Sequence, residues 1–483
     1  MTYFHGVETI ETKSAGVTVQ GVKSSVVGLV GTAPIHHVDA ADRKTNVDVL
    51  CLSDVDDVKY FGPNVAGYTI PQALETLRAE GTKFVVVVNV FDPATHKTSV
   101  AAADYAIGSD LKAQLADGDI ISAVVKVGGG AGSALVEGTD YTLDYVTGQL
   151  TIIAGAALDA ETDANVAYDK GSTSSIASGD VIGGVDGGGN RTGAQAWLNS
   201  FGNRGFHPKI LLAPQYSTQS SVVAAMRTLA ASDKLRAILA VDAPVGTSVS
   251  DAIAGRGPAG SINFNVAGDR SFLCCPHVYV YNKVTDSNVL VPLSTTYAGV
   301  VAKTDATLGF WHTPSNKQSL SMLGLEYPIS ASINDKASDA AVLNGAGIIT
   351  VFNIFGSGYR IWGNRSAAFP GDGSVNSLVT QRRIADQIHE SLENAMLNVI
   401  DVPITSTTIG DVLQGTNAYM RGLVSRKAVP PGSRVEFQTA KNPASEIAKG
   451  KTKFTIIFVG SVPMENIIFE SVVDTTLLAA AAA

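Results

Sequence analysis

Short apolar runs alternate with amphipathic stretches along the first part of the chain, which predicts strands and helices in turn. An apolar run at 24–34 is followed by a helical pattern at 70–81 and by four consecutive valines within 83–90. A run without polar alternation suits a strand that is covered on both faces of a sheet. This region therefore predicts a β-α-β unit.

The same alternation resumes further along the chain, with apolar runs at 209–214, 236–244 and 272–282 that are separated by helical patterns. Strands separated by helices need crossover connections, and such connections produce a mostly parallel sheet. We therefore predict an α/β core domain built from 25–96 and 187–363.

The intervening segment, 97–186, has short alternating runs and glycine-rich turns instead. Its stretch 141–153 has the form of a hairpin around a Thr-Gly turn. We predict a small β domain that enters and leaves the core at adjacent points. Between Lys97 and Asn190 there are thirteen acidic and four basic residues, so this segment accounts for the whole formal net charge of -9.

Two apolar strands are predicted at 348–355 and 359–362, on either side of Gly356, Ser357 and Gly358. A tight turn needs residues that tolerate positive φ, so this pattern predicts a hairpin. By itself such a hairpin is typical of any α/β protein. Because an amphipathic helix is predicted soon after it, we place the junction of two structural layers here.

The region 364–466 predicts an α+β C-terminal domain. Its first helix is predicted at 378–400, its second at 408–426, and two strands follow near 434–438 and 453–459. The first helix has one strong apolar face, because five large apolar residues recur at steps of four. These residues are Ile384, Ile388, Leu392, Met396 and Ile400.

Both ends of the chain lie outside these alternations, and we predict them to be extended arms, 1–24 and 467–483. The stretches 5–12 and 465–473 both favour β structure. A terminal segment of this kind is either a frayed tail or an arm that is ordered on a neighbouring molecule. For 465–473 a further alternative is a strand that completes the sheet of its own domain.

The composition limits the classes of protein to which the chain can belong. No apolar run approaches the length of about 18 residues that spans a membrane, and the polar N-terminus lacks a signal-peptide pattern, so we expect a soluble protein made in the cytosol without membrane insertion. The negative net charge argues against a nucleic-acid partner. Eight basic residues against two acidic ones within 421–453 indicate either a solvated face or a surface for an acidic partner. Cys51, Cys274 and Cys275 form no CxxC pair, which favours buried thiols.

Patterns that specify an enzyme are missing from the sequence. The glycine cluster at 181–193 precedes a helix, but it has no phosphate-loop spacing and no lysine. His36 and His37 are adjacent, which in a strand places them on opposite faces. Asp56 and Asp57 are also adjacent, which is typical of a solvated loop. We therefore predict no catalytic residue, metal ligand or cofactor.

Several segments follow one another in order from 298 to 450: AGVVAKTD, GFWHTPSN, LNGAGIITVFN, GYRIWGNRSA, RRIADQIHESLENAMLNVID and NPASEIAKG. In this order and spacing they resemble the tail sheath proteins of contractile phages. The resemblance covers most of the chain outside the segment 97–186.

The resemblance implies a structural, non-enzymatic subunit of the virion tail that is assembled in the host cytoplasm. Many copies would form a helical sheath around the inner tail tube protein, attached to baseplate and tail terminator proteins, and would contract to drive the tube through the host envelope. The same part in a phage-derived bacteriocin or secretion device is the closest alternative. A nucleotide-binding α/β enzyme is the alternative from a different class.

For such an assembly we expect the acidic insert to face outward, because crowded like charge is costly to desolvate at a contact. The C-terminal domain should form the inner layer, with Arg382 and Arg383 as tube contacts on the polar side of the 378–400 helix. Strands exchanged between neighbours are implied by the resemblance, and they place the arms between subunits. The arm residues that we single out are His5, Val7, Ile10, Ile467, Phe469 and Val472.

Overall fold

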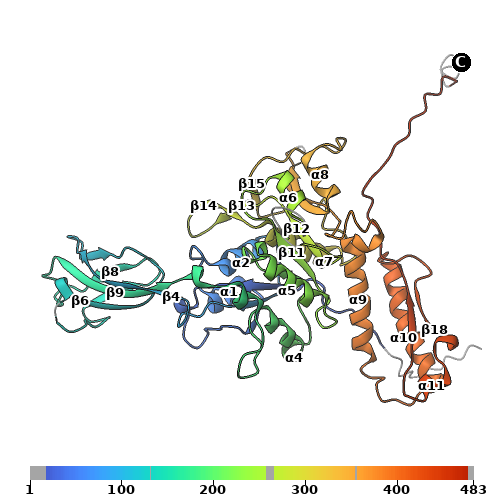
Figure 1. The fold of residues 1–483 in the computed structure, drawn as a ribbon, viewed down its shortest axis with the longest axis horizontal. Coiled ribbons are helices and arrows are strands. Elements are labelled where there is room, and N and C mark those ends of the chain that lie inside the picture. The colour runs from blue at the N-terminus through green and yellow to red at the C-terminus, as the bar shows by residue number, and fades with distance from the viewer. Residues whose placement is uncertain (1–17, 131, 257–265, 354–355, 477–483) are drawn as a thin grey trace, which may run out of the picture.

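The computed structural model describes residues 18–130, 132–256, 266–353 and 356–476. Its centre is an eight-stranded sheet in the order β17-β16-β12-β11-β10-β1-β3-β2, in which the six inner strands are parallel and both edge strands are antiparallel (Figure 1). This arrangement confirms the α/β class with a mostly parallel core. The strands are β1 (Val27–Gly31), β2 (Asp48–Cys51), β3 (Val85–Asn89), β10 (Ile210–Leu212), β11 (Ile238–Asp242), β12 (Ser271–Cys274), β16 (Ile348–Asn353) and β17 (Tyr359–Trp362).

Helices bury this sheet on its faces. The helix α2 (Thr69–Ala79) packs against α7 (Leu293–Thr307), while α3 (Ser178–Ile182) packs against α5 (Ser220–Ala231). The four valines of β3 are fully buried, as the unbroken apolar run predicted. Other helices of this domain are α1 (Asp54–Phe61), α4 (Ser200–Arg204), α6 (Val249–Gly255) and α8 (Asp339–Gly345). Among the described residues there is no helix with the length and apolarity that a membrane crossing requires.

The predicted hairpin is confirmed at the end of the sheet. Strand β16 pairs in parallel with β12 on one side and antiparallel with β17 on the other. Gly356 and Gly358 in the turn have φ of +67° and +85°, conformations that a side chain would disfavour.

The apolar run 272–282 was expected to form one strand, and this expectation is wrong. It is divided between β12 and β13 (Val278–Asn282), which belongs to a separate antiparallel sheet with β14 (Ser287–Val291) and β15 (Met322–Leu325). Pro276 lies between the two strands, and proline has no N–H to continue a ladder.

The insert consists of two three-stranded sheets around their own apolar cluster, and it projects to the left in Figure 1. Lys97 at its start pairs with Gly171 at its end, so the chain enters and leaves at one place. Val181 of α3 belongs to the core cluster, so the β unit ends nearer 171 than 186. Its strands are β4 (Lys97–Ala106), β5 (Lys112–Gln114), β6 (Ile120–Val127), β7 (Tyr141–Asp144), β8 (Gln149–Ile152) and β9 (Asp163–Gly171).

The C-terminal region contains α9 (Val379–Met396), α10 (Ser406–Ser425), a short α11 (Ala444–Ile447) and a hairpin of β18 (Arg434–Phe437) with β19 (Phe454–Ile457). Its apolar cluster includes Ile384, Ile388 and Leu392 from α9, as the spacing predicted. Ile400 is different, because α9 ends at Met396 and Ile400 is exposed. Asp401 has a positive φ and Pro403 disfavours helix before it, so the helix cannot continue that far.

Two pairs of adjacent polar residues have roles that the sequence did not reveal. Asp56 forms a capping box with Ser53 at the start of α1, and Asp57 is buried in a bidentate pair with Arg78, so the solvated-loop interpretation is wrong. His36 and His37 lie in a 3-10 turn (Ile35–His37) instead of a strand. In that turn both rings point to the same side.

Candidate assembly surfaces

The polar side of α9 is packed against the core domain. Arg383 forms a buried ion pair with Asp305 of α7, with 2.5 Å between Nη1 and Oδ1. A second nitrogen of Arg383 donates to the carbonyl of Ser24 at 3.1 Å. Arg383 therefore binds α9 both to the core and to the start of the chain.

Two further ion pairs join α9 to core residues that directly precede the strands β12 and β10. Asp386 accepts two hydrogen bonds from Arg270, at 2.6 and 2.8 Å. Glu390 lies 2.6 Å from Nζ of Lys209. Burial lowers the pKa of Lys209 and raises that of Glu390, and the attraction between the two groups opposes both shifts.

These contacts revise the expectation that this side of α9 is free for partners. Asp386, Glu390 and Arg383 are all buried within the chain. Arg382 bonds to Asp269 at 3.2 Å and Asp386 at 3.0 Å, and about a fifth of its side chain stays exposed (21%). These partners could not be predicted from the sequence, because they come from other elements far along the chain.

The start of the described chain runs along the same helix. Val22 donates its N–H to Oγ of Ser391 at 3.3 Å, and Val19 packs against the C-terminal apolar cluster. Lys23 places its Nζ 4.4 Å from the ring centre of Phe84. The segment 18–24 is therefore attached to its own subunit. His5, Val7 and Ile10, which were assigned to the arm, lie outside the described residues.

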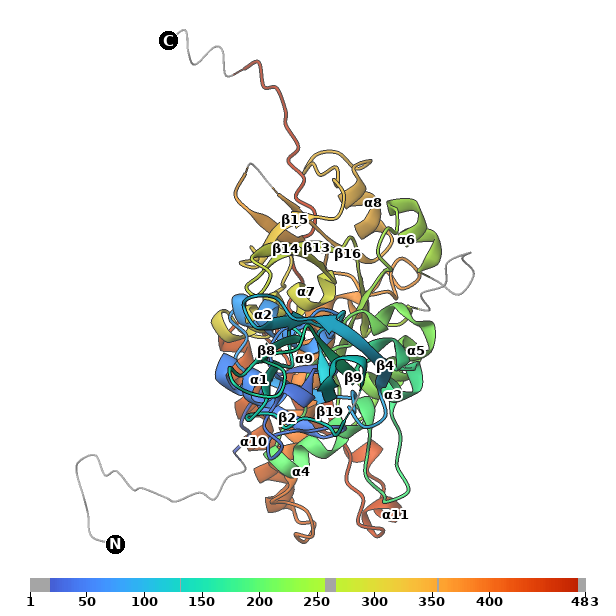
Figure 2. The same ribbon diagram turned by 90° about the vertical axis from the view of Figure 1, so that its left-hand side faces the viewer.

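The C-terminal extension leaves the body of the protein, as Figures 1 and 2 show. Ser461 is held by backbone hydrogen bonding to Ala428, and Glu465 by an ion pair of 2.6 Å with Arg365. Beyond Glu465 the described chain has no helix or strand. The alternative that 465–473 completes the sheet of its own domain is wrong for this chain. The predicted arm residues are exposed to solvent: Ile467 by 61%, Phe469 by 92% and Val472 by 84%.

The hairpin of β18 and β19 has two open edges. Within the described ranges these strands pair only with each other. Two-stranded sheets are marginally stable by themselves, and unpaired strand edges can accept another strand. The chain therefore contains both an apolar extension that pairs with no strand and open strand edges with which such an extension could pair.

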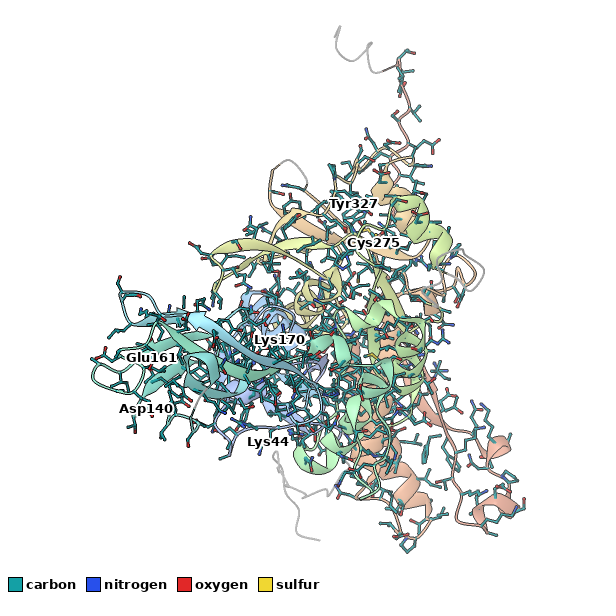
Figure 3. The ribbon with its side chains drawn as sticks, turned by 60° about the vertical axis from the view of Figure 1, so that its left-hand side comes forward. Lys44, Asp140, Glu161, Lys170, Cys275 and Tyr327 are labelled. Atoms are coloured by element: carbon teal, nitrogen blue, oxygen red, sulfur yellow. The ribbon has the colours of Figure 1, made fainter. Side chains whose placement is uncertain are left out.

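Charge is distributed between opposite ends of the molecule. The acidic insert lies at one end, where Figure 3 shows Asp140 and Glu161 far from the core. The basic residues of 421–453 are all exposed around α10, β18 and α11, at the other end in Figure 1. These residues are Arg421, Arg426, Lys427, Arg434, Lys441, Lys449, Lys451 and Lys453.

The chain is similar to known proteins over nearly its whole length. A profile of the phage tail sheath protein central domain matches residues 189–367. The tail sheath protein of Burkholderia phage BcepMu is 40% identical over 481 residues, which cover 99% of this chain and 98% of that protein. The chain belongs to the phage tail sheath protein family. The sheath protein of Escherichia phage P2 is a more distant relative, 26% identical over 59% of this chain and 68% of its own length.

Solved sheath structures share the fold. The sheath complex of an extracellular contractile injection system in its contracted state has a TM-score of 0.59 at 13% identity, covering 99% of both chains. The contracted helical sheath of the anti-feeding prophage also has a TM-score of 0.59, at 17% identity, covering 98% of this chain and all of that one. The chain is thus a structural subunit of a contractile tail sheath, a component of the virion tail. The residues that match the central domain, 189–367, begin before α4 and end after β17, so they do not include the insert.

Proposed function

We propose that copies of this chain polymerise into a helical sheath through exchanged terminal strands, and that the sheath contracts around an inner tail tube. The observation that carries this proposal is the exposed apolar extension 465–473, which pairs with no strand among the described residues, in a chain whose β18–β19 hairpin has open edges. Exposed Phe469 and Val472 do not stabilise a monomer. In an assembly, burial of these side chains against a neighbouring subunit would stabilise the contact.

Strand exchange suits contraction for a physical reason. Each main-chain hydrogen bond contributes roughly 1 kcal/mol net and depends little on side-chain packing. An added strand therefore keeps two subunits connected while their rigid domains slide and rotate. The buried ion pairs between α9 and the core support movement of each subunit as one body. Two lattice packings of similar free energy then allow a trigger at one end to release the whole sheath.

The charge distribution supports an orientation for each subunit. We place the acidic insert outside and the basic C-terminal face toward the inner tube, with baseplate and terminator proteins at the two ends of the sheath. Arg382 keeps an exposed part that could reach a partner, whereas Arg383 in this conformation could not. Contraction between two packings is driven by no cofactor, catalytic residue, nucleic acid or membrane anchor. The subunit assembles in the host cytoplasm before joining the virion.

Electron microscopy of the purified full chain tests the proposal. Helical tubes are expected from the intact protein, and a variant without Met1–Lys13 should stay folded and soluble but form no tubes. A variant with the same thirteen residues replaced by Gly and Ser separates the length of the arm from its sequence. Closed small oligomers under every assembly condition, or full tubes from the truncated chain, would contradict the proposal.

The geometry does not favour the nucleotide-binding alternative. In the glycine cluster, the N–H groups of Gly188 and Asn190 donate to the carboxylate of Asp186, at 2.9 and 2.8 Å. The carboxylate of Asp186 therefore already accepts the hydrogen bonds that these amides would have to donate to a phosphate. Calorimetric titration with ATP and NAD should therefore give no heat of binding. The fold relatives include the sheaths of an extracellular contractile injection system and of an anti-feeding prophage. The closest alternative, the sheath of a phage-derived injection device, can be tested by identifying the genes that accompany this one.

A further inference from the structure

The insert and the core meet at a cluster of ionisable side chains. Asp119, in the insert between β5 and β6, reaches into the core with its carboxylate. Its Oδ1 lies 2.7 Å from Nε2 of His36 and 3.0 Å from Nε2 of His37. Its Oδ2 accepts a hydrogen bond of 2.7 Å from the hydroxyl of Tyr68.

The local backbone structure brings His36, His37 and Asp119 together at the junction. The 3-10 turn places both imidazoles on one side, with ring centres 4.0 Å apart. Asp119 has a φ of +58°, which is uncommon for a residue with a side chain, and it is fixed by backbone hydrogen bonds to Val146 and Gly171. A Cβ on Gly171 would lie 2.2 Å from both Oδ2 of Asp119 and the Tyr68 hydroxyl, so only glycine leaves room for the carboxylate.

The cluster is shielded from solvent. The side chains of His36 and His37 are 2% and 5% exposed, and that of Asp119 is 17% exposed. Burial opposes the charge of Asp119, but the hydrogen bonds from both histidines and Tyr68 outweigh it and hold its pKa at about 2. Three side chains of the core therefore hold the carboxylate of Asp119 at the junction.

We propose that His36, His37 and Asp119 form a zinc site that fastens the insert to the core. The three ligand atoms lie within 4.8 Å of one another. In a tetrahedral zinc site with bonds of about 2.0–2.1 Å, ligand atoms are about 3.3 Å apart, so each nitrogen needs to withdraw from Oδ1 by only about half an ångström. Two imidazoles and one carboxylate are donors that zinc accepts, with water as its fourth ligand.

The surroundings also predict how tightly zinc binds. Tyr68 holds the free oxygen of Asp119, as an outer partner of a metal ligand should. Nδ1 of His36, by contrast, is buried without a hydrogen-bond partner among the described residues. A ligating imidazole normally donates its second N–H, and loss of such a partner weakens binding by about 10- to 100-fold. The site should thus bind more weakly than a structural zinc finger does.

Calorimetric titration of the untagged, chelator-treated full chain with zinc chloride tests the site. One zinc ion per chain is expected, with a rise in melting temperature and visible absorption of a tetrahedral complex when cobalt replaces zinc. Asp119→Asn removes a ligand itself, so it should lower the affinity by more than the about 10- to 100-fold that loss of an outer partner costs, and should remove the cobalt signal. Asp117→Asn is the matched control, because this neighbouring carboxylate binds Lys170 and Tyr168 instead and should leave zinc binding unchanged.

His37→Gln provides a second variant if Asp119→Asn does not fold, since its amide can still donate to Asp119 but is a poor zinc ligand. Loss of zinc binding in folded His37→Gln supports the site. Absence of zinc binding by the intact chain, or equal binding by the Asp119 and Asp117 variants, overturns it and leaves a hydrogen-bonded junction only. Neither result depends on whether the chain forms sheaths.

Discussion

Arg383 of α9 and Asp305 of α7 form a buried ion pair that ties the C-terminal domain to the core. Both residues are less than 10% exposed, and the second guanidinium nitrogen binds the backbone at Ser24. Three parts of the chain therefore meet at one side chain. This relationship gives Arg383 a role in stability whether or not a partner lies nearby.

Replacing Arg383 by Met should lower the free energy of unfolding by about 3–5 kcal/mol, because Asp305 is left charged and buried without a partner. Arg382→Met is the matched control. Its side chain is partly exposed, so we expect a loss of about 1 kcal/mol or less. Urea unfolding of the two variants measures both values. Equal losses of unfolding free energy would show that the buried pair of Arg383 stabilises the fold no more than the partly exposed pairs of Arg382.

Charge reversal at Arg382 alone tests the proposed contact with the tube. Arg382→Glu should weaken assembly of sheath on tubes, especially at low salt, while the melting temperature falls by only a few degrees. Lys317→Glu, a reversal outside the C-terminal domain, serves as control. Normal assembly of Arg382→Glu on tubes would remove this residue from the contact.

His207 makes stability depend on pH. Burial, and then the nearby charge of Lys209, lower its pKa to about 4, and the ring stacks on Phe201. In the unfolded chain the group binds a proton near pH 6.5, whereas the folded chain does not until about pH 4. The stability from neutral His207 is therefore complete above pH 6.5 and is lost as the pH falls toward 4, by at most about 1.4 kcal/mol per pH unit.

His207→Gln should flatten the stability curve in this window, as measured by urea unfolding at intervals from pH 7 to pH 4. Other acid-sensitive groups remain in both proteins, so the difference between the two curves is the relevant quantity. Parallel curves for variant and parent would mean that His207 does not titrate in this way.

Deletion of the insert should spare the core. Lys97 and Gly171 are paired neighbours, so a linker of three or four glycines can replace residues 98–170. The insert has a separate apolar cluster, and we expect the shortened chain to fold and to form sheaths. Circular dichroism and electron microscopy check the two expectations. A folded variant that cannot polymerise would place the insert within the lattice.

Ending the chain after Pro463 should give a folded monomer that forms no sheath, because the remaining fold keeps the contact of Ser461 with Ala428. The double variant Ile467→Asp and Phe469→Asp should have the same effect, since charged residues on one side of an added strand oppose its burial. Glu470→Gln is the control and should assemble normally. Sedimentation and electron microscopy distinguish these outcomes, and assembly of the truncated chain would exclude the C-terminal arm as a linker.

Much of the architecture was readable from local sequence. The valine run of β3, the glycine turn between β16 and β17 and the apolar spacing of α9 each depend on residues close together in the chain. The exposed arm 465–473 was also recognisable, because it is apolar and lies beyond the last predicted domain. Family resemblance then supplied the function.

Only the tertiary structure determined which partners the polar residues have. The sequence places Arg383, Asp386 and Glu390 on one side of α9, but it does not show that Asp305, Arg270 and Lys209 meet them there. Hydrophobic periodicity reports which face of an element is buried, since burial of apolar area depends little on direction or partner. Hydrogen bonds and ion pairs need a specific partner at a specific distance and angle, and that partner comes from a distant part of the chain that only folding brings near.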